Sequence, residues 1–341
     1  MAKKSVVRHH IFTIGASSGG IEALTDLVAN LPGDLPASLF VVIHIPAESK
    51  SVLPEILSRA GPLRATHATD NEAILPGRIY VGPPDYHLLL RKGHMRLVRG
   101  PKENNHRPAI DPLFRTAARA YANRAVGIVL SGARDDGAAG LIAIKNVGGI
   151  AIVQDPSEAI FPDMPRNALK AAVPDFCLSV KDIAKTIVTL STQFLSEEQG
   201  KTMEDETKKE TEIVGMSELA IEDDDKPGTP SVFGCPDCGG VLWELQDDEW
   251  LRFRCRVGHA YSAEGLLASQ GEDLEQALWN AFRVLHEHAA LARRLAERAR
   301  ENKMDLITKR YETRARDAEQ QAHLIRELLM SGKINGREAV D

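Results

Sequence analysis

The stretch IFTIGASSGGIEAL, residues 11–24, decides the fold of this chain. Its first residues, Ile11–Ile14, are apolar as in a buried strand, and GASSGG follows as a glycine-rich turn. From Ile21 onward apolar residues recur at helical spacing until Pro32-Gly33 interrupts the pattern. A strand, a tight turn and a helix in this order form the typical unit of a parallel α/β sheet.

The same alternation of strand-like and helix-like patterns continues to about residue 195. Three more apolar, β-branched runs predict buried strands: Leu39–Ile43, Ala125–Leu130 and Ile150–Val153. We therefore expect an α/β domain over residues 1–195 with a doubly wound, mainly parallel, flavodoxin-like sheet. A hairpin is predicted from Leu88–Leu90 and Met95–Val98.

The composition indicates a soluble globular protein, with 43% hydrophobic and 26% charged residues among 341. No run approaches the ~18 consecutive apolar residues of a membrane span, and no signal-peptide pattern opens the chain. The four cysteines do not suggest a secreted disulfide framework, so we expect a cytoplasmic protein. A net charge of -6 argues against general nucleic-acid binding.

Three further segments follow the α/β domain. Residues 196–230 hold 12 acidic and 4 basic residues and predict an acidic, disordered linker. Residues 231–265 form a compact Cys/His module, and residues 270–332 predict an antiparallel helical hairpin. One apolar stripe marks its first helix: Leu274, Leu278, Ala281, Leu285, His288, Leu291 and Leu295. A second stripe marks the other helix: Ala315, Ala318, Ala322, Ile325 and Leu329. The apolar stripe of the hairpin is a candidate docking surface for partner helices, and the alternative is that the two stripes bury only each other.

Ser17 lies in the glycine-rich turn, at the carboxyl edge of the predicted sheet and at a helix N-terminus. There the backbone N–H groups favour a developing negative charge, so Ser17 is a candidate nucleophile with the N–H of Ser18 as oxyanion donor. A dinucleotide site fits poorly, because GASSGG lacks the G-x-G-x-x-G spacing. The literal G-x-S-x-G of Gly15–Gly19 and a purely structural turn remain as alternatives.

His44 and Asp136 are the candidate base and orienting acid, since each follows a predicted strand and faces the same edge as Ser17. A structural histidine and a helix N-cap are the alternative interpretations of these two residues. Asp135 is an adjacent rival of Asp136.

The motifs GASSGG, VVIHIP, LPGRIYVGPPDYHL, HRPAIDPLF, GIVLSGARDDGAAGL and FPDMPRNAL resemble, in order, those of the chemotaxis receptor methylesterase (CheB) family. The resemblance implies hydrolysis of glutamate γ-methyl esters on receptor signalling helices, and in some members deamidation of glutamine. It assigns the catalytic triad to Ser17, His44 and Asp136, in preference to Asp135, and requires no cofactor for catalysis.

Two departures from the family pattern qualify the resemblance. Family members often have Met where Ala133 stands, in the loop that supplies a second oxyanion N–H. Many members also carry an N-terminal receiver domain, whereas this chain opens on the esterase motifs. We therefore expect a stand-alone bacterial esterase whose C-terminal half, joined by a flexible linker, takes over regulation or docking. The resemblance also suggests that His106, Arg107, Asp111 and Arg166 lie near the cleft, although loop-fixing hydrogen bonds and helix capping explain them equally well.

Cys235, Cys238, Cys255 and His259 have the spacing of a structural zinc site. The pair Cys235-Pro-Asp-Cys238 is a knuckle that directs two thiolates to one point. Three sulfurs and one nitrogen complete a tetrahedral set, so we expect a zinc-ribbon-like module with structural Zn²⁺.

The leading hypothesis is a protein-glutamate methylesterase acting in signal transduction. Its expected partners are methylated receptor signalling helices or a sensor kinase, with membranes involved only indirectly through receptors and with no nucleic acid. The alternative hypothesis is a non-catalytic esterase-like module that binds a receptor or sensor kinase.

Overall fold

The computed structural model of the chain describes residues 6–8, 11–196, 203, 205–216, 228–247 and 250–331. It forms two compact units, Met1–Gly265 and Leu266–Asp341. In the described part of the chain, no helix combines the length and apolarity needed to cross a bilayer.

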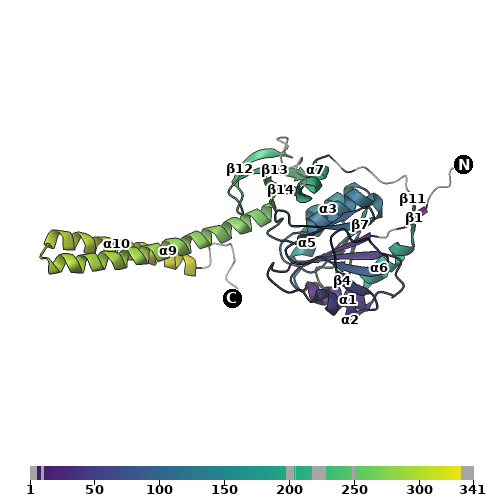
Figure 1. Cartoon of the computed structure of the whole chain (residues 1–341), viewed down its shortest axis with the longest axis horizontal. Coiled ribbons are helices and arrows are strands. Elements are labelled where there is room, and N and C mark those ends of the chain that lie inside the picture. Colours follow the sequence, from purple (N-terminus) through teal and green to yellow (C-terminus); the bar gives the residue numbers. More distant parts are fainter. Residues whose placement is uncertain are drawn as a thin grey trace. The chain divides into compact units, whose positions relative to one another are not determined.

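A seven-stranded sheet is the centre of the first unit, and every strand pair in it is parallel (Figure 1). Its spatial order is β10 (Phe176–Leu178), β9 (Ile150–Gln154), β8 (Ala125–Val129), β2 (Ile11–Ala16), β3 (Ser38–Ile43), β5 (Arg78–Val81) and β4 (Arg64–His67). The four strands predicted from apolar runs are confirmed as β2, β3, β8 and β9. Their residues are almost entirely buried, because helices cover both faces of the sheet.

Two hydrophobic cores lie on opposite faces of this sheet, and each is closed by three helices. One face carries α1 (Gly20–Ala29), α2 (Leu53–Ala60) and α6 (Val180–Thr192). The other carries α3 (Ile110–Tyr121), α4 (Ala138–Asn146) and α5 (Asp163–Ala172). The predicted doubly wound α/β fold is therefore confirmed. A short 3₁₀ turn (Ala122–Arg124) connects α3 to β8.

Two small antiparallel pairs complete the α/β domain. The predicted hairpin is confirmed as β6 (His87–Arg91) and β7 (His94–Val98), and the Tyr121 hydroxyl bonds the Gly93 N–H and the Arg91 carbonyl. Near the ends of the domain, β1 (Val6–Arg8) pairs with β11 (Phe194–Ser196).

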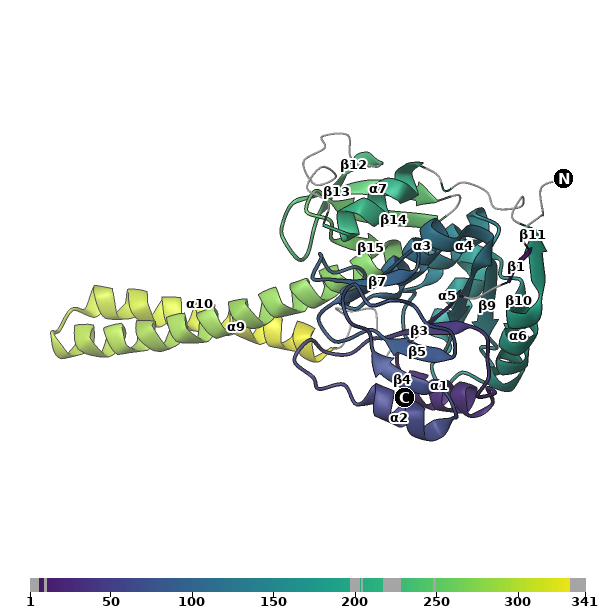
Figure 2. The same ribbon diagram turned by 45° about the vertical axis from the view of Figure 1, so that its right-hand side comes forward.

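The Cys/His module belongs to the same compact unit as the α/β domain. It is a four-stranded antiparallel sheet of β12 (Thr229–Gly234), β13 (Val241–Asp247), β14 (Trp250–Cys255) and β15 (Ala260–Ser262) (Figure 2). Ala260 of β15 also bridges to Glu103, so the module contacts a loop of the α/β domain through backbone hydrogen bonds.

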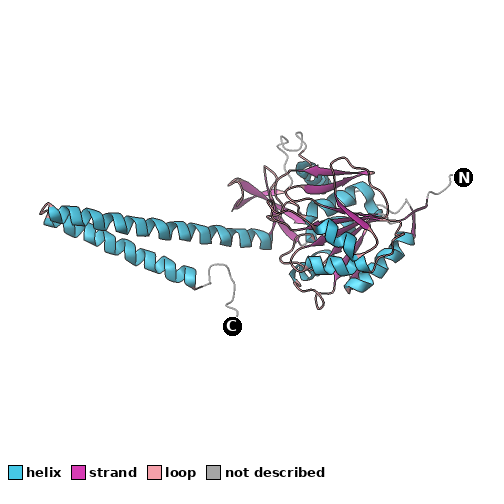
Figure 3. Cartoon of the chain, turned by 60° about the horizontal axis from the view of Figure 1, so that its bottom comes forward, coloured by secondary structure: helices cyan, strands magenta, loops and turns pink. Residues whose placement is uncertain are grey.

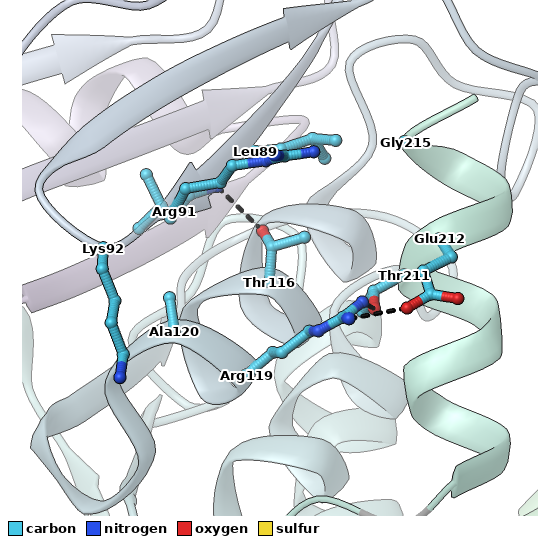
Figure 4. Close-up of a pocket in the computed structure, with 10 residues that line it drawn as sticks. Leu89, Arg91, Lys92, Thr116, Arg119, Ala120, Thr211, Glu212 and Gly215 are labelled. Carbon is cyan, nitrogen blue, oxygen red and sulfur yellow. Dashed lines mark hydrogen bonds and ion pairs between the residues drawn. The ribbon is translucent and has the colours of Figure 1, made fainter. Parts of the chain in front are cut away.

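Part of the segment predicted as a disordered linker forms a helix, α7 (Asp205–Val214). Arg119 of α3 donates hydrogen bonds to Thr211 and Glu212 of α7, at 2.5 and 2.7 Å (Figure 4). Glu210, which is 2% exposed, accepts from both terminal nitrogens of Arg252 at 2.9 Å and from Arg254 Nε at 3.0 Å. The composition of this segment predicts that its acidic residues are solvated, but Glu210 is buried against arginines of the module. These ion pairs explain why residues 205–214 form a helix and not a disordered linker.

The remaining parts of the predicted linker, residues 197–202, 204 and 217–227, lie outside the described residues. α7 borders a pocket of 410 Å³, drawn in Figure 4, which it shares with α3 and the β6–β7 hairpin. Arg91, Lys92 and Arg119 give this pocket a basic lining, and Arg119 already pairs with Glu212.

The described part of the second unit is a pair of antiparallel helices: α9 (Ala263–Glu301), from Leu266 onward, and α10 (Asp305–Met330) (Figure 3). Small side chains fill their contact: Ala289, Ala292, Ala296, Ala299, Ala315, Ala318 and Ala322 are buried. Ion pairs join Arg293 to Glu319 and Arg300 to Glu312. Along the stripe predicted for the first helix, Leu274 and Leu291 are 51% and 56% exposed, and the buried contact passes through the neighbouring alanines.

Candidate active site

The three predicted triad residues follow three adjacent strands at their carboxyl ends. Ser17 follows β2, His44 follows β3, and Asp136 comes after β8. β2 lies between β3 and β8, at the point where the winding of the chain changes direction. Ligand sites of open parallel sheets gather in the crevice at this point.

The turn that carries Ser17 is held tightly against the loop after β8. The Ser17 N–H donates to the Ser131 carbonyl, and the Gly20 N–H donates to the Ser17 carbonyl, both at 2.9 Å. A Cβ at Gly132 would lie 2.1 Å from Met164 Sδ and 2.9 Å from Ser17 Cβ, so only glycine allows this approach. The serine is consequently presented on a rigid turn at the sheet edge.

A continuous hydrogen-bond chain joins the three side chains. The Ser17 hydroxyl lies 3.0 Å from His44 Nδ1, and His44 Nε2 lies 2.7 Å from Asp136 Oδ2. The neutral imidazole that suits this chain carries its proton on Nε2, toward the carboxylate, and leaves Nδ1 free to accept from the serine. Such an arrangement can remove a proton from a hydroxyl that attacks a carbonyl.

Asp136 is buried and accepts four hydrogen bonds. Its Oδ2 also accepts from the Ile110 N–H at 2.7 Å, and its Oδ1 accepts from Asn104 Nδ2 at 2.9 Å and from the Asp111 N–H at 3.2 Å. Burial raises the pKa of Asp136, but hydrogen bonding and attraction from His44, with the Ile110 N–H, lower it by more. The carboxylate therefore stays ionised and can stabilise an imidazolium at His44.

Asp135, the alternative candidate for the orienting acid, binds β15 and not His44 through its described side-chain hydrogen bond. Its Oδ1 accepts from the Ser262 hydroxyl of β15 at 2.8 Å, and burial raises its pKa to about 6. It makes none of the described hydrogen bonds to His44. The geometry thus brings Asp136, and not Asp135, to the histidine.

His106 also belongs to the site, and its contact with His44 was not predicted from the sequence. Its ring stacks on His44 with centroids 3.5 Å apart and planes within 8°. Burial, and then the charge of His44, lower the pKa of His106 to about 3, so the ring is neutral at physiological pH. A neutral aromatic face beside His44 fixes the orientation of the imidazole without adding a competing positive charge.

The other residues suggested near the cleft have mainly structural contacts. Asp111 accepts from the Gly137 and Gly140 N–H groups at the start of α4, and burial and the charge of Asp136 raise its pKa to about 8. Arg107 binds Asp85 and the Gly100 carbonyl. The Ser18 carbonyl accepts from Ser131 Oγ, and Ala133 directly follows Gly132 in the loop packed on Ser17.

A pocket of 440 Å³ opens beside Ser17 and His44. Its wall includes the apolar side chains of Ile21, Ile45 and Val52. Glu22 and Lys50 also line the pocket, so the lining next to the Ser17 hydroxyl combines apolar and charged side chains.

Cys235, Cys238, Cys255 and His259 converge as predicted, with their ligand atoms all within 4.8 Å of one another. The Cys238–Cys255 Sγ distance is 3.8 Å, and His259 Nδ1 lies 3.7 and 3.5 Å from Cys235 and Cys255 Sγ. A tetrahedral zinc with usual bond lengths requires S···S distances of about 3.8 Å and S···N distances of about 3.6 Å. The four residues therefore fit a tetrahedral metal ion.

Comparison with known proteins agrees with this geometry. The family CheB methylesterase matches residues 12–187. A protein of Leptospira interrogans is 38% identical over 185 residues, which are 54% of this chain and 96% of that protein. The protein-glutamate methylesterase/protein-glutamine glutaminase of Maricaulis maris is 36% identical over 189 residues, and this chain spans only 47% of its length.

Among solved structures, the Thermotoga maritima CheB methylesterase catalytic domain matches with a TM-score of 0.52 and 31% identity. The match covers 54% of this chain and 100% of that domain. The chain belongs to the CheB methylesterase family. Its C-terminal module and helices lie outside the matched residues.

Proposed function

We propose that this protein hydrolyses γ-methyl esters of glutamate on receptor signalling helices and also deamidates glutamine there. The observation that carries the proposal is the hydrogen-bond chain from Ser17 through His44 to Asp136, at 3.0 and 2.7 Å. The two activities for which its relatives are named, methylesterase and glutaminase, share one chemistry, the attack on a side-chain acyl carbon.

In the proposed reaction, Ser17 Oγ attacks the ester carbonyl while His44 Nδ1 accepts the hydroxyl proton. The N–H groups of Ser18 and Ala133 stabilise the oxyanion of the tetrahedral intermediate. When this intermediate collapses, His44 returns the proton to the departing methoxide and methanol leaves. Water then hydrolyses the glutamyl ester on Ser17 by the same steps and releases the glutamate.

Exposed apolar side chains around the serine support a helical protein substrate. Ile21 and Val52 line the pocket beside Ser17, and Ile160 and Phe161 lie against Gly19, two residues from it. Four exposed large apolar residues around one nucleophile suit the apolar face of a partner helix. A cytoplasmic location accords with this substrate.

The second part of the proposal concerns the metal. Zn²⁺ at Cys235, Cys238, Cys255 and His259 would connect the turn after β12 to the end of β14 and so stabilise the module. All four tetrahedral positions are supplied by the protein, which favours a structural role over a catalytic one.

Methanol release from a methylated receptor fragment tests the esterase proposal. Ser17→Ala should lower the turnover by about 10⁴-fold or more, because the nucleophile is lost. Ser231→Ala, in the Cys/His module, is the matched control and should retain turnover. Near-wild-type methanol release by Ser17→Ala would refute the assignment, and binding of the fragment without turnover by the wild type would favour the non-catalytic alternative.

A further inference from the structure

One loop, residues 102–106, lies between the active site and the Cys/His module. On one side, Asn104 and His106 contact Asp136 and His44. On the other side, the Ala260 N–H of β15 donates to the Lys102 carbonyl at 3.3 Å, and the Asn104 N–H donates to the Ala260 carbonyl at 2.7 Å. Any shift of β15 would therefore be transmitted to the loop by backbone hydrogen bonds.

Asn104 uses its whole side chain in this connection. Its Oδ1 accepts from the Ser262 N–H of β15 at 3.0 Å. Its Nδ2 donates to Asp136 Oδ1 at 2.9 Å and to Asp111 Oδ2 at 3.0 Å. One amide group thus joins a strand of the module to the carboxylate that binds His44.

The backbone of Asn104 is held in a conformation that needs support. Its φ is +51°, and Asn105 follows at +69°. Residues other than glycine adopt this left-handed region at a cost, although asparagine adopts it more readily than most. The two β15 hydrogen bonds supply support of this kind for Asn104.

A buried set of charges fixes the same loop next to Asn104. Glu103, 1% exposed, accepts from Arg115 of α3 at 2.5 Å and from Arg254 of β14 at 2.9 Å. Arg254 is itself bound to Glu210 of α7. Because Glu103 and Arg254 are both buried, separating the module from the α/β domain would break their ion pair, at a high free-energy cost.

We propose that Asn104 is a positioning residue for Asp136 and that the Cys/His module, through β15, is a built-in support of the active site. The proposal rests on the esterase function proposed above. The sequence predicted a C-terminal half that regulates the esterase from the end of a flexible linker. The present proposal differs, because the module contacts the active-site loop directly and supports it permanently. Without the Asn104 amide, Asp136 Oδ1 retains the Asp111 N–H, its longest hydrogen bond at 3.2 Å.

The test is Asn104→Gly in the full chain, since glycine keeps the positive φ and removes only the side chain. The first readout is the proton NMR signal of the His44 Nε2–H, assigned by its loss in His44→Asn. We expect this signal to shift or to disappear through exchange in Asn104→Gly. We also expect kcat to fall about tenfold or more with KM nearly unchanged, because substrate contacts remain.

Ser231→Ala, in the same module but outside these contacts, should leave both the signal and kcat as in the wild type. Treating the full wild-type chain with EDTA should perturb the His44 signal as Asn104→Gly does. An unchanged signal with kcat within twofold in Asn104→Gly would overturn the positioning role. An unperturbed His44 signal after zinc has been removed, as measured by elemental analysis, would overturn the role of the module.

The two proposals fail in different ways. If the wild type releases no methanol but its His44 signal still responds to Asn104→Gly, the positioning role stands and the esterase assignment falls. If methanol release is normal and the signal does not respond, only the positioning role falls.

Discussion

Replacing Asp136 by asparagine should abolish most of the esterase activity without creating a cavity, because the two side chains have the same size. Each carboxylate oxygen accepts two N–H groups: Oδ2 from His44 and Ile110, and Oδ1 from Asn104 and Asp111. An amide has only one acceptor oxygen, so its NH₂ must face one of these pairs of donors. If the NH₂ faces His44, the imidazole proton moves to Nδ1, and the ring can no longer accept the proton of Ser17.

The expected loss in kcat is about 10⁴-fold, or roughly 5.5 kcal/mol of transition-state stabilisation. If the NH₂ faces Asn104 and Asp111 instead, the tautomer survives but the negative charge that stabilises the imidazolium is lost. Either orientation therefore lowers the rate, and KM should change little because Asp136 is buried away from solvent.

Asp135→Asn is the matched control, one residue away and equally buried. The Ser262 hydroxyl can still donate to the amide oxygen of this variant, so the described side-chain hydrogen bond of Asp135 is kept. We expect its kcat to stay within about threefold of the wild type. The assay is methanol release, with thermal unfolding to verify that each variant is folded. A loss below tenfold in Asp136→Asn, or an equal loss in Asp135→Asn, would refute the reasoning.

Two further predictions concern the module. Glu210→Ala should lower the free energy of unfolding by about 3–5 kcal/mol, because it leaves Arg252 and Arg254 buried without their shared carboxylate; Glu212→Ala, which breaks an exposed pair with Arg119, should cost at most about 1 kcal/mol in the same denaturant titration. Burial raises the pKa of Glu210, but the two arginines lower it by more. The contribution of Glu210 to the free energy of unfolding is therefore complete above about pH 5 and is lost as the pH falls. A Glu210→Ala chain whose stability keeps the wild-type pH dependence would contradict this. Elemental analysis of protein purified without added metal should find one zinc per chain, and a zinc content near zero with a folded module would count against the site.

The sequence predicted the α/β domain well because the pattern that defines it is local. A parallel strand covered on both faces is a short, continuous apolar run, as in Leu39–Ile43, and glycine-rich turns mark the strand ends. Since parallel strands end at one edge, a residue that follows each of three strands is expected at one site. The hydrogen bonds among Ser17, His44 and Asp136 agree with that expectation.

The sequence did less well where burial depends on a distant partner. Glu210 lies in a strongly acidic segment, so composition marks it as solvated. Its pairing with Arg252 and Arg254 joins residues 42 and 44 positions apart, and no local pattern reports such a contact. The contact between α9 and α10 was not predicted for a similar reason, because the alanines that allow close approach are weaker sequence signals than the exposed leucines Leu274 and Leu291.

The sequence by itself determined the alternation of strands and helices, the glycine-rich turn that carries Ser17 and the Cys/His spacing of the candidate metal site, since each is written in local spacing. Only the tertiary structure decided which atoms surround the triad. The stacking of His106 on His44 and the bridge from Ser262 through Asn104 to Asp136 join residues far apart in the chain. Such contacts depend on side-chain directions and buried charges that exist only once the sheet, the loop and β15 have come together.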